Sequence, residues 1–267
     1  MNAIELRQVS FGYQQEKLFH NFSLVIEAGD FLGIVGPNGS GKSTLLKLIA
    51  RIVIPWAGEI NVLGKNLNRL TRREIARMIA FVPQESYFAF DWTVEDVVMM
   101  GRNPYRQTIF QPSARDREIV SKAMGLTGVI AYRQRNINAI SAGERQLVII
   151  ARALAQEPAV LLLDEATSHL DLFHRVEILR VLISLRQQKK TIVAIYHDLN
   201  EAINYCSRLA FLKSGTLLAC GEPDKLNYQE LIRAAYGIEP VVDRHPVTGR
   251  PQIFLPAELQ LSAEQLL

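Results

Sequence analysis

The sequence predicts an α/β fold with a mainly parallel core sheet, an N-terminal antiparallel β subdomain and an inserted helical subdomain. Three runs, "DFLGIVG", "AVLLLDE" and "KTIVAIYHD", are short, almost wholly apolar and separated by helical patterns. Continuous apolar runs of this length are typical of parallel strands that are buried on both faces. The insert is predicted because strand signals vanish and helical patterns dominate from about residue 85 to residue 157.

Composition and charge are those of an ordinary globular chain. Of the 267 residues, 48% are hydrophobic and 21% are charged, and the net charge is +3. This mild charge does not argue for nucleic-acid binding, and no stretch approaches the roughly 18 consecutive apolar residues of a membrane span. The first residues, "MNAIELRQVSFGY", alternate and carry charge early, unlike a signal peptide. We therefore expect a soluble, cytoplasmic protein.

The N-terminal part is expected to alternate strands and helices. Residues 3–13 and 22–30 have the pattern of short, half-buried strands. After the first core strand, apolar residues recur at i, i+3, i+4 and i+7, which predicts a helix that Pro55 stops. The residues of that apolar face are Leu45, Leu48, Ile49 and Ile52. A strand, a helix and a strand follow, at residues 58–64, 71–79 and 80–84.

The second half repeats this order after the helical insert. The insert has helical patterns at residues 93–102 and 113–126, and a third helix that Ser141 opens. Beyond the two later core strands, a hairpin is expected around Ser214 and Gly215, then a short helix and a polar, proline-bearing tail. We predict one domain with three parts: a core of residues 1–84 and 158–222, a helical subdomain of residues 85–157, and a C-terminal extension of residues 223–267.

A glycine-rich run, "GPNGSGKST", follows the first core strand and opens a helix. It fits G-x-x-x-x-G-K-[ST], whose backbone N–H groups turn inward around phosphate oxygens. Lys42 is expected to reach the β- and γ-phosphates, and the Ser43 hydroxyl to bind Mg²⁺. A glycine turn that only caps the helix is the alternative. The predicted nucleotide contacts of this P-loop are Gly36, Pro37, Asn38, Gly39, Ser40, Gly41, Lys42, Ser43 and Thr44.

Polar side chains follow three of the other predicted strands. Asp164 and Glu165 end one strand; in P-loop NTPases such an aspartate helps to hold Mg²⁺, and the adjacent glutamate could polarise the attacking water. His197 follows the next strand and is expected to contact the γ-phosphate, because strand C-termini line the nucleotide crevice. Gln84 is expected to touch Mg²⁺ or water when the helical insert is docked. Alternatively, the two acids only face solvent and the histidine has a structural role. The pair of acids favours ATP hydrolysis over simple nucleotide storage.

A second small-residue run, "ISAGERQ", opens the last helix of the insert. Ser141 and Glu144 form an S-x-x-E capping box. The box does not explain why Ala142 and Gly143 between them are both tiny, which leaves the helix end open. A helix N-terminus with free N–H groups and a serine hydroxyl is also an anion site. Since the P-loop belongs to the other subdomain, we predict that a second protein molecule brings the phosphate.

These motifs, in this order, resemble those of the nucleotide-binding subunits of ABC transporters. The resemblance covers the whole chain and rests on the P-loop, the glutamine loop, "ISAGERQ", "LLLDEATSHLD" and "YHD". It implies a P-loop NTPase with a RecA-like core, and a homodimer that closes head to tail around ATP and Mg²⁺. The signature run of one subunit then clamps ATP on the P-loop of the other. Tyr13 matches the aromatic residue that stacks on adenine, and Ser168 to Asp171 match the loop that bridges the sites.

The signature run departs from the family's usual L-S-G-G-Q at Ile140, Ala142 and Glu144. Alanine is expected to be tolerated if its φ is negative. Glu144 would place negative charge near the incoming γ-phosphate, so Glu144→Gln is expected to tighten ATP-driven dimerisation modestly.

The runs "TVEDVVMMGRNPY", "ATSHLD" and "YGIEPVVDRHPVTGRP" are similar to those of importers for metal chelates (ferric siderophores, haem, cobalamin) and some oxyanions. The resemblance implies an ATPase at the cytoplasmic face of the inner membrane, working with permease subunits and indirectly with a substrate-binding protein. The aromatic run Tyr87 to Trp92 is expected to contact the permease, or else to form a satellite core under the insert.

Two other classes of function remain open at this point. A soluble ABC ATPase that acts on nucleic acid or ribosomes usually carries two cassettes, coiled coils or basic inserts, and none is present, so no nucleic-acid partner is expected. A P-loop kinase explains Gly36 to Ser43 but leaves "ISAGERQ" and the acidic pair unused.

Overall fold

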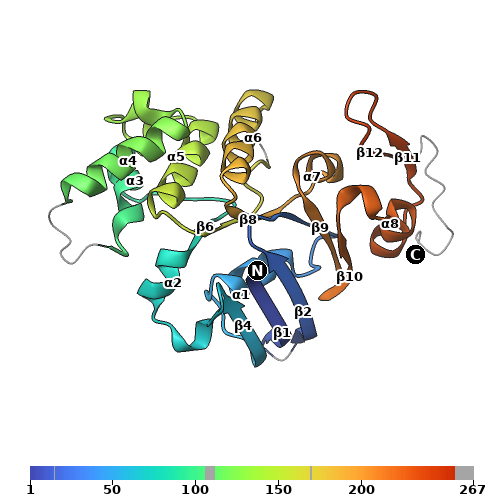
Figure 1. Cartoon of the computed structure of the whole chain (residues 1–267). Coiled ribbons are helices and arrows are strands. Elements are labelled where there is room, and N and C mark those ends of the chain that lie inside the picture. Colours follow the sequence, from blue (N-terminus) through green and yellow to red (C-terminus); the bar gives the residue numbers. More distant parts are fainter. Residues whose placement is uncertain (15, 106–111, 169, 256–267) are drawn as a thin grey trace.

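A computed structural model describes residues 1–14, 16–105, 112–168 and 170–255 (Figure 1). Residue 169, within the predicted bridging loop, and residues 256–267 of the predicted extension therefore lie outside the described residues. A six-stranded sheet in the order β10-β9-β3-β8-β7-β6 forms the centre. All its neighbouring strands pair parallel except β9 and β10, which form the predicted hairpin. The strands are β3 (Phe31–Val35), β6 (Ile79–Val82), β7 (Val160–Leu163), β8 (Thr191–Ile195), β9 (Arg208–Lys213) and β10 (Thr216–Gly221).

An antiparallel sheet in the order β2-β1-β4-β5 forms the N-terminal part, as predicted. Its strands are β1 (Asn2–Tyr13), β2 (Glu16–Glu27), β4 (Ala57–Val62) and β5 (Lys65–Asn66). The prediction of short strands was wrong, since β1 and β2 each have 12 residues. The ladder between them contains register shifts, and Gln8 and Asn21 have φ of 49°. Such bulges interrupt the alternation in sequence while the two strands remain paired.

Strands β3, β7 and β8 of the central sheet are buried on both faces, because their successive side chains enter different cores. In β7, Leu161 and Leu163 pack with the helical segment, whereas Val160 and Leu162 pack with α1 and the antiparallel sheet. These two cores explain why the run "AVLLLDE" is continuously apolar. Because β3, β8, β7 and β6 run parallel, their carboxyl ends lie along the same edge of the sheet.

Helix α1 (Lys42–Ile49) is shorter than the apolar pattern predicted. Leu45, Leu48 and Ile49 are buried, but Ile52 is 56% exposed. The helix ends because Arg51 adopts a left-handed φ of 52°, and the Ile52 N–H donates back to the Lys47 carbonyl at 2.8 Å. This C-terminal capping turn ends the helix before Pro55 is reached.

Between β6 and β7, the described residues form helices and no named strand, in agreement with the predicted texture. Figure 1 shows α3, α4 and α5 side by side at one end of the molecule. Besides α1, the α-helices of the described residues are α2 (Arg72–Met78), α3 (Val94–Met99), α4 (Ala114–Leu126), α5 (Ala142–Ala155), α6 (Leu172–Gln187), α7 (Leu199–Tyr205) and α8 (Tyr228–Tyr236). Over the described ranges, no helix is both long and apolar enough to cross a bilayer.

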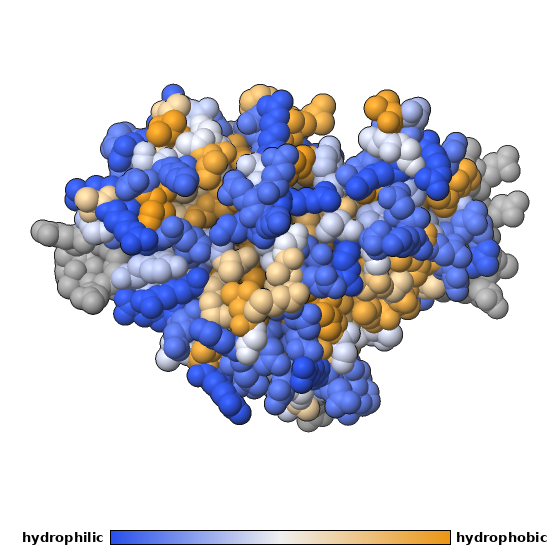
Figure 2. All heavy atoms as spheres, in the orientation of Figure 1, coloured by the Kyte–Doolittle hydropathy of each residue, from blue (hydrophilic) through white to orange (hydrophobic). Residues whose placement is uncertain are grey.

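The C-terminal part contains a hairpin that the sequence patterns did not reveal. After α8, strands β11 (Val241–Arg244) and β12 (Pro251–Phe254) pair antiparallel. The hairpin packs on α7, where Asn200 exchanges two hydrogen bonds with the Ile253 backbone, at 3.0 and 2.8 Å. Tertiary contacts such as these, together with a 2.8 Å hydrogen bond from Arg250 to the Asn204 carbonyl, stabilise so short a pair of strands. Figure 2 shows apolar residues gathered over β10 and α8, beside this region.

Candidate functional site

The glycine-rich run lies between β3 and α1, as predicted. Gly36 has a φ of 151°, and a Cβ there would collide with the Leu212 carbonyl oxygen, so no other residue fits without moving the backbone. Lys42 is buried, and its Nζ donates to the carbonyl oxygens of Gly36 and Pro37 at 2.8 and 2.9 Å. Burial lowers the pKa of Lys42, and the charges of Glu165 and Asp164 oppose that shift. The loop therefore curls around its own lysine ammonium.

A hollow of about 380 Å³ opens over this loop. Tyr13 lies at its mouth with 49% of its surface exposed; its hydroxyl shares a 3.3 Å hydrogen bond with the Thr44 hydroxyl. Phe11 packs edge-on against the Tyr13 ring at 5.1 Å, which fixes the ring beside the loop. The hollow is lined by Tyr13, Glu16, Lys17, Leu18, Asn38, Gly39, Gly41, Lys42, Ser43, Thr44 and Glu165.

The two predicted metal-binding side chains on α1 and β7 meet directly. The Ser43 hydroxyl donates to Asp164 Oδ1 at 2.9 Å. Burial raises the pKa of Asp164, and the Ser43 hydrogen bond opposes that shift. A hydroxyl and a carboxylate are oxygen donors of the kind that Mg²⁺ prefers when it keeps several waters. Among the described residues no group of three or more His, Cys, Asp or Glu is arranged to hold a metal ion. This donor pair thus fits a cation that takes its other ligands from water or phosphate.

Three side chains from the ends of β6, β7 and β8 meet at Glu165. Its carboxylate is buried, accepts a 2.7 Å hydrogen bond from Gln84 Nε2 and lies 2.6 Å from His197 Nε2. Glu165 also has a left-handed φ of 52°, a strained conformation for this residue type that occurs often at functional sites. The structure therefore brings together the acid, the histidine and the glutamine that the sequence predicted separately.

A buried contact behind Glu165 was missed at the level of sequence. Thr167, two residues after Glu165, donates to Glu201 Oε1 at 2.8 Å, and Arg175 lies 3.6 Å from the other oxygen of Glu201. Burial raises the pKa of Glu201. Glu201 lies on α7, four residues after His197, so this network joins the turn after β7 to the helix after β8. No local pattern signals this contact, because Thr167 and Glu201 are 34 residues apart and follow different strands.

The run "ISAGERQ" starts α5 with the predicted capping box. Ser141 is the N-cap: the Glu144 N–H donates to its hydroxyl at 3.2 Å, and the Ser141 N–H donates to Glu144 Oε2 at 2.7 Å. Hydrogen bonds from the Ser141 N–H and from the Tyr132 hydroxyl lower the pKa of Glu144. Glu144 is thus turned back onto its own cap. Ala142 is the first helical residue, so its φ is negative, as tolerance of alanine requires.

Ser141 and Ala142 are exposed, and residues 141–144 do not line the hollow over the P-loop of their own chain. Gly143, in contrast, is buried. The run and the hollow over the P-loop thus lie apart within one subunit, as expected if the run faces outward; its role at a nucleotide stays a prediction.

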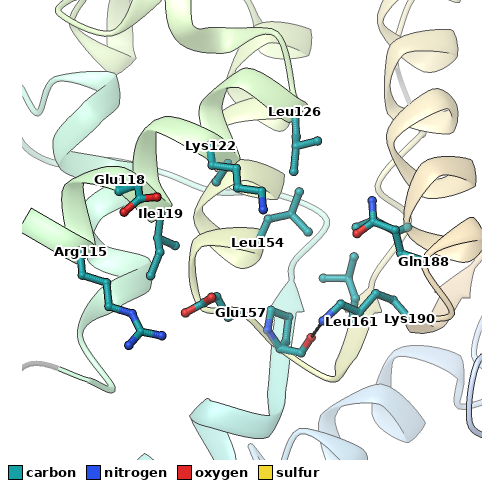
Figure 3. A pocket seen from close by; sticks show the side chains of 13 residues that line it. Arg115, Glu118, Ile119, Lys122, Leu126, Leu154, Glu157, Leu161, Gln188 and Lys190 are labelled. Atoms are coloured by element: carbon teal, nitrogen blue, oxygen red, sulfur yellow. Dashed lines mark hydrogen bonds between the residues drawn. The ribbon is translucent and has the colours of Figure 1, made fainter.

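A second hollow, also of about 380 Å³, lies between α4, the end of α5 and the end of α6 (Figure 3). The figure shows apolar side chains, Ile119, Leu126 and Leu154 among them, with Lys122 and Lys190 also lining it. None of the predicted site residues lines this hollow, so it is separate from the nucleotide site.

The comparisons with known proteins agree with this site. Residues 19–168, more than half of the chain, match the family described as ABC transporter. The ferric enterobactin transport ATP-binding protein FepC of Escherichia coli (strain K12) is 36% identical over 92% of this chain and 91% of its own. A solved structure of a metal-chelate type ABC transporter, described as putative and inward-facing, superposes with a TM-score of 0.84 at 29% identity, over 96% of this chain and 97% of the other. A dimeric structure of a bacterial ABC transporter cassette is 28% identical with a TM-score of 0.72, over 82% of this chain and 98% of the other.

Fold and site define a nucleotide-binding P-loop ATPase. The chain belongs to the ABC transporter family, and it is an ATP-hydrolysing subunit of that family. Such ATPases act as dimers and together with permease components. Family membership decides against the P-loop kinase, and it favours a transporter subunit over an ATPase that acts on nucleic acid or ribosomes.

Proposed function

We propose that this chain powers an importer for a metal chelate, such as a ferric siderophore, by ATP-driven closure of a head-to-tail homodimer. The observation that carries the hydrolytic part is the carboxylate of Glu165, held between Gln84 and His197 beside the Ser43–Asp164 pair. The cargo is proposed from the similarity to the ferric enterobactin protein and to the metal-chelate transporter. An uptake experiment tests this cargo. Host cells that carry an inactive form of the chain are expected to lose uptake of a radiolabelled ferric siderophore.

In the proposed mechanism, ATP lies over the P-loop with its adenine against the ring of Tyr13. Ser43 and Asp164 would hold Mg²⁺, which would neutralise charge on the transferring phosphate. Lys42 exchanges its two carbonyl partners for phosphate oxygens, and Glu165 accepts a proton from the attacking water. His197 orients that water and stabilises the charge that develops on the γ-phosphate. Positioning and electrostatics of this kind carry most phosphoryl-transfer catalysis.

The homodimer is proposed because residues 141–144 do not line the P-loop hollow of their own chain. A second copy of the chain could supply them. Ser141, Ala142 and Gly143 lie at the start of α5, and its free N–H groups favour an anion. In the closed dimer, the Ser141 hydroxyl of one subunit contacts the γ-phosphate held by the other subunit. Each of the two ATP sites is then completed in trans.

The membrane-facing surface is proposed at the aromatic run after Gln84. Tyr87 is 85% exposed and Phe90 is 69% exposed, while Phe90 and Trp92 pack edge-on at 6.3 Å. An exposed aromatic group of this kind suits a protein partner better than solvent. We assign this run to the permease subunits, at the cytoplasmic face of the membrane, with a substrate-binding protein acting on the other side.

A concentration series tests the shared site. If each site needs two subunits, hydrolysis per molecule rises with protein concentration below the dissociation constant of the dimer and levels off above it. The measurement is phosphate release, without any added acceptor, at constant ATP and increasing protein. A flat specific activity in samples shown to be monomeric would contradict a site completed in trans.

A matched pair of cap variants tests the role of Ser141. Ser113 caps α4 with the same kind of box, its hydroxyl accepting the Asp116 N–H at 3.1 Å, but it lies outside the site. Ser141→Ala and Ser113→Ala are each expected to lower the free energy of unfolding by about 1 kcal/mol. Only Ser141→Ala is expected to weaken ATP-driven dimerisation, by about tenfold or more, because a hydrogen bond to a charged group is lost. Equal dimerisation by the two variants would restrict Ser141 to capping.

A further inference from the structure

The start of α5 is covered by a side chain of its own subunit, the imidazole of His174. A Cβ on Gly143 would lie 2.5 Å from His174 Nδ1 and 2.6 Å from His174 Cδ2, closer than real Cβ contacts allow. The imidazole ring therefore occupies the space that a side chain at position 143 would need, and only a glycine leaves room for it. This contact within one chain is enough to explain a glycine at position 143, so no bound phosphate is needed to account for it.

The same ring contacts Asp171, the last residue of the run that the family resemblance assigns to the bridge between the two sites. His174 Nδ1 lies 3.0 and 2.9 Å from the two carboxylate oxygens of Asp171, and the His174 N–H donates to Asp171 Oδ1 at 2.9 Å. Phe173 packs edge-on against the imidazole at 5.3 Å. The His174 side chain is 17% exposed, while that of Asp171 is 65% exposed. A mostly buried ring thus fixes an exposed carboxylate.

We propose that His174 is a positioning residue that joins the start of α5 to Asp171, the N-cap of α6, within one subunit. Both elements then approach the partner's nucleotide as one rigid surface. This inference rests on the proposed head-to-tail dimer and concerns how its trans half is held in shape. His174 does not itself line the hollow over the P-loop of its own subunit, so we expect its effect on turnover to pass through Gly143 and Asp171.

A double-mutant cycle between Gly143 and His174 tests the contact. Gly143→Ala alone forces the ring away and is expected to slow ATP hydrolysis by about 10- to 100-fold, as a misplacement of about 1 Å can do. His174→Ala alone is expected to slow it by about tenfold. The double variant is expected to be no slower than His174→Ala, because the added methyl group then has space. Strong non-additivity of this kind reports direct contact. Additive losses would overturn the proposal, since Gly143 would then be needed only for the partner's phosphate.

The readouts separate positioning from folding. ATP binding to the monomer, measured at low protein concentration in a Glu165→Gln background, uses the P-loop and is expected to be unchanged by His174→Ala. Dimerisation of the same protein at saturating ATP is expected to require about tenfold more protein. His174→Phe retains a ring over Gly143 and is expected to recover part of the dimerisation, whereas equal loss in the phenylalanine and alanine variants, or weaker ATP binding by the monomer, would contradict a positioning role.

The two proposals fail in different ways. A parent protein whose activity does not rise with concentration, and whose Glu165→Gln variant does not dimerise with ATP, would refute the proposed dimer. A parent protein that dimerises normally while the Gly143 and His174 variants behave additively would refute only the role of His174.

Discussion

Replacing Glu165 with glutamine is expected to slow ATP hydrolysis by about 10²- to 10⁴-fold, the usual contribution of a general base. The amide keeps the size of the side chain and can still contact Gln84 and His197, but it cannot accept a proton from water. ATP binding is expected to persist, because Lys42 and the P-loop backbone are unchanged. The ATP-bound dimer is therefore expected to accumulate, which size-exclusion chromatography with and without ATP detects.

The matched control for this variant is Glu59→Gln. Glu59 is an exposed glutamate on β4, in the antiparallel sheet, and does not line the nucleotide hollow. Its substitution removes the same charge and is expected to leave turnover within twofold of the parent. Undiminished phosphate release by Glu165→Gln would remove Glu165 as the base. Normal turnover by the control together with slow turnover by Glu165→Gln would support the proposed role.

Replacing Lys42 with alanine is expected to weaken ATP binding and to slow hydrolysis by about 10²- to 10³-fold, as removal of one preorganised charge-stabilising donor does. Lys42 is only 6% exposed, and its ammonium holds the Gly36 and Pro37 carbonyls at 2.8 and 2.9 Å. Without it, both carbonyl oxygens lose a partner and the loop loses its cation. Equilibrium binding of a fluorescent ATP analogue and phosphate release measure the two effects separately.

Lys42→Arg and Lys65→Ala complete this experiment. The arginine variant keeps the positive charge, but its planar guanidinium does not fit a loop built around a compact ammonium, so a large loss is expected again. Lys65 lies exposed on β5, and its replacement is expected to leave binding and turnover unchanged. Full activity in Lys42→Arg would mean that charge alone matters at this position. Full ATP affinity in Lys42→Ala would exclude the lysine from nucleotide binding.

Much of the fold was predictable from local patterns. The runs that became β3, β7 and β8 were identified because parallel strands with two buried faces leave a continuous apolar signature. The capping box of Ser141 and Glu144 was predicted from a spacing of three residues, and the structure contains both of its hydrogen bonds. Features of this kind depend on neighbours in sequence, so the sequence alone contains their signal.

Other features depend on contacts between distant segments and were wrong or missing. Ile52 fits the apolar period of α1, but a left-handed Arg51 ends the helix before it. The bulged pairing of β1 with β2 lengthened strands that looked short. The hairpin of β11 and β12 is stabilised by Asn200 of α7, about 50 residues earlier, which no local pattern indicates. The division of the domain into a core, a helical subdomain and a C-terminal extension stays a prediction.

For the site, the sequence by itself determined which chemical groups are present: a P-loop lysine, a serine hydroxyl, two carboxylates, a histidine and a glutamine. Tertiary structure decided which of them meet, because Gln84, Glu165 and His197 follow three different strands and converge only through the order β6, β7, β8 in the sheet. It also changed the explanation of Gly143, whose small size accommodates His174 of the same chain. Spacing along the chain identifies a residue, whereas the packing of remote segments determines what that residue touches.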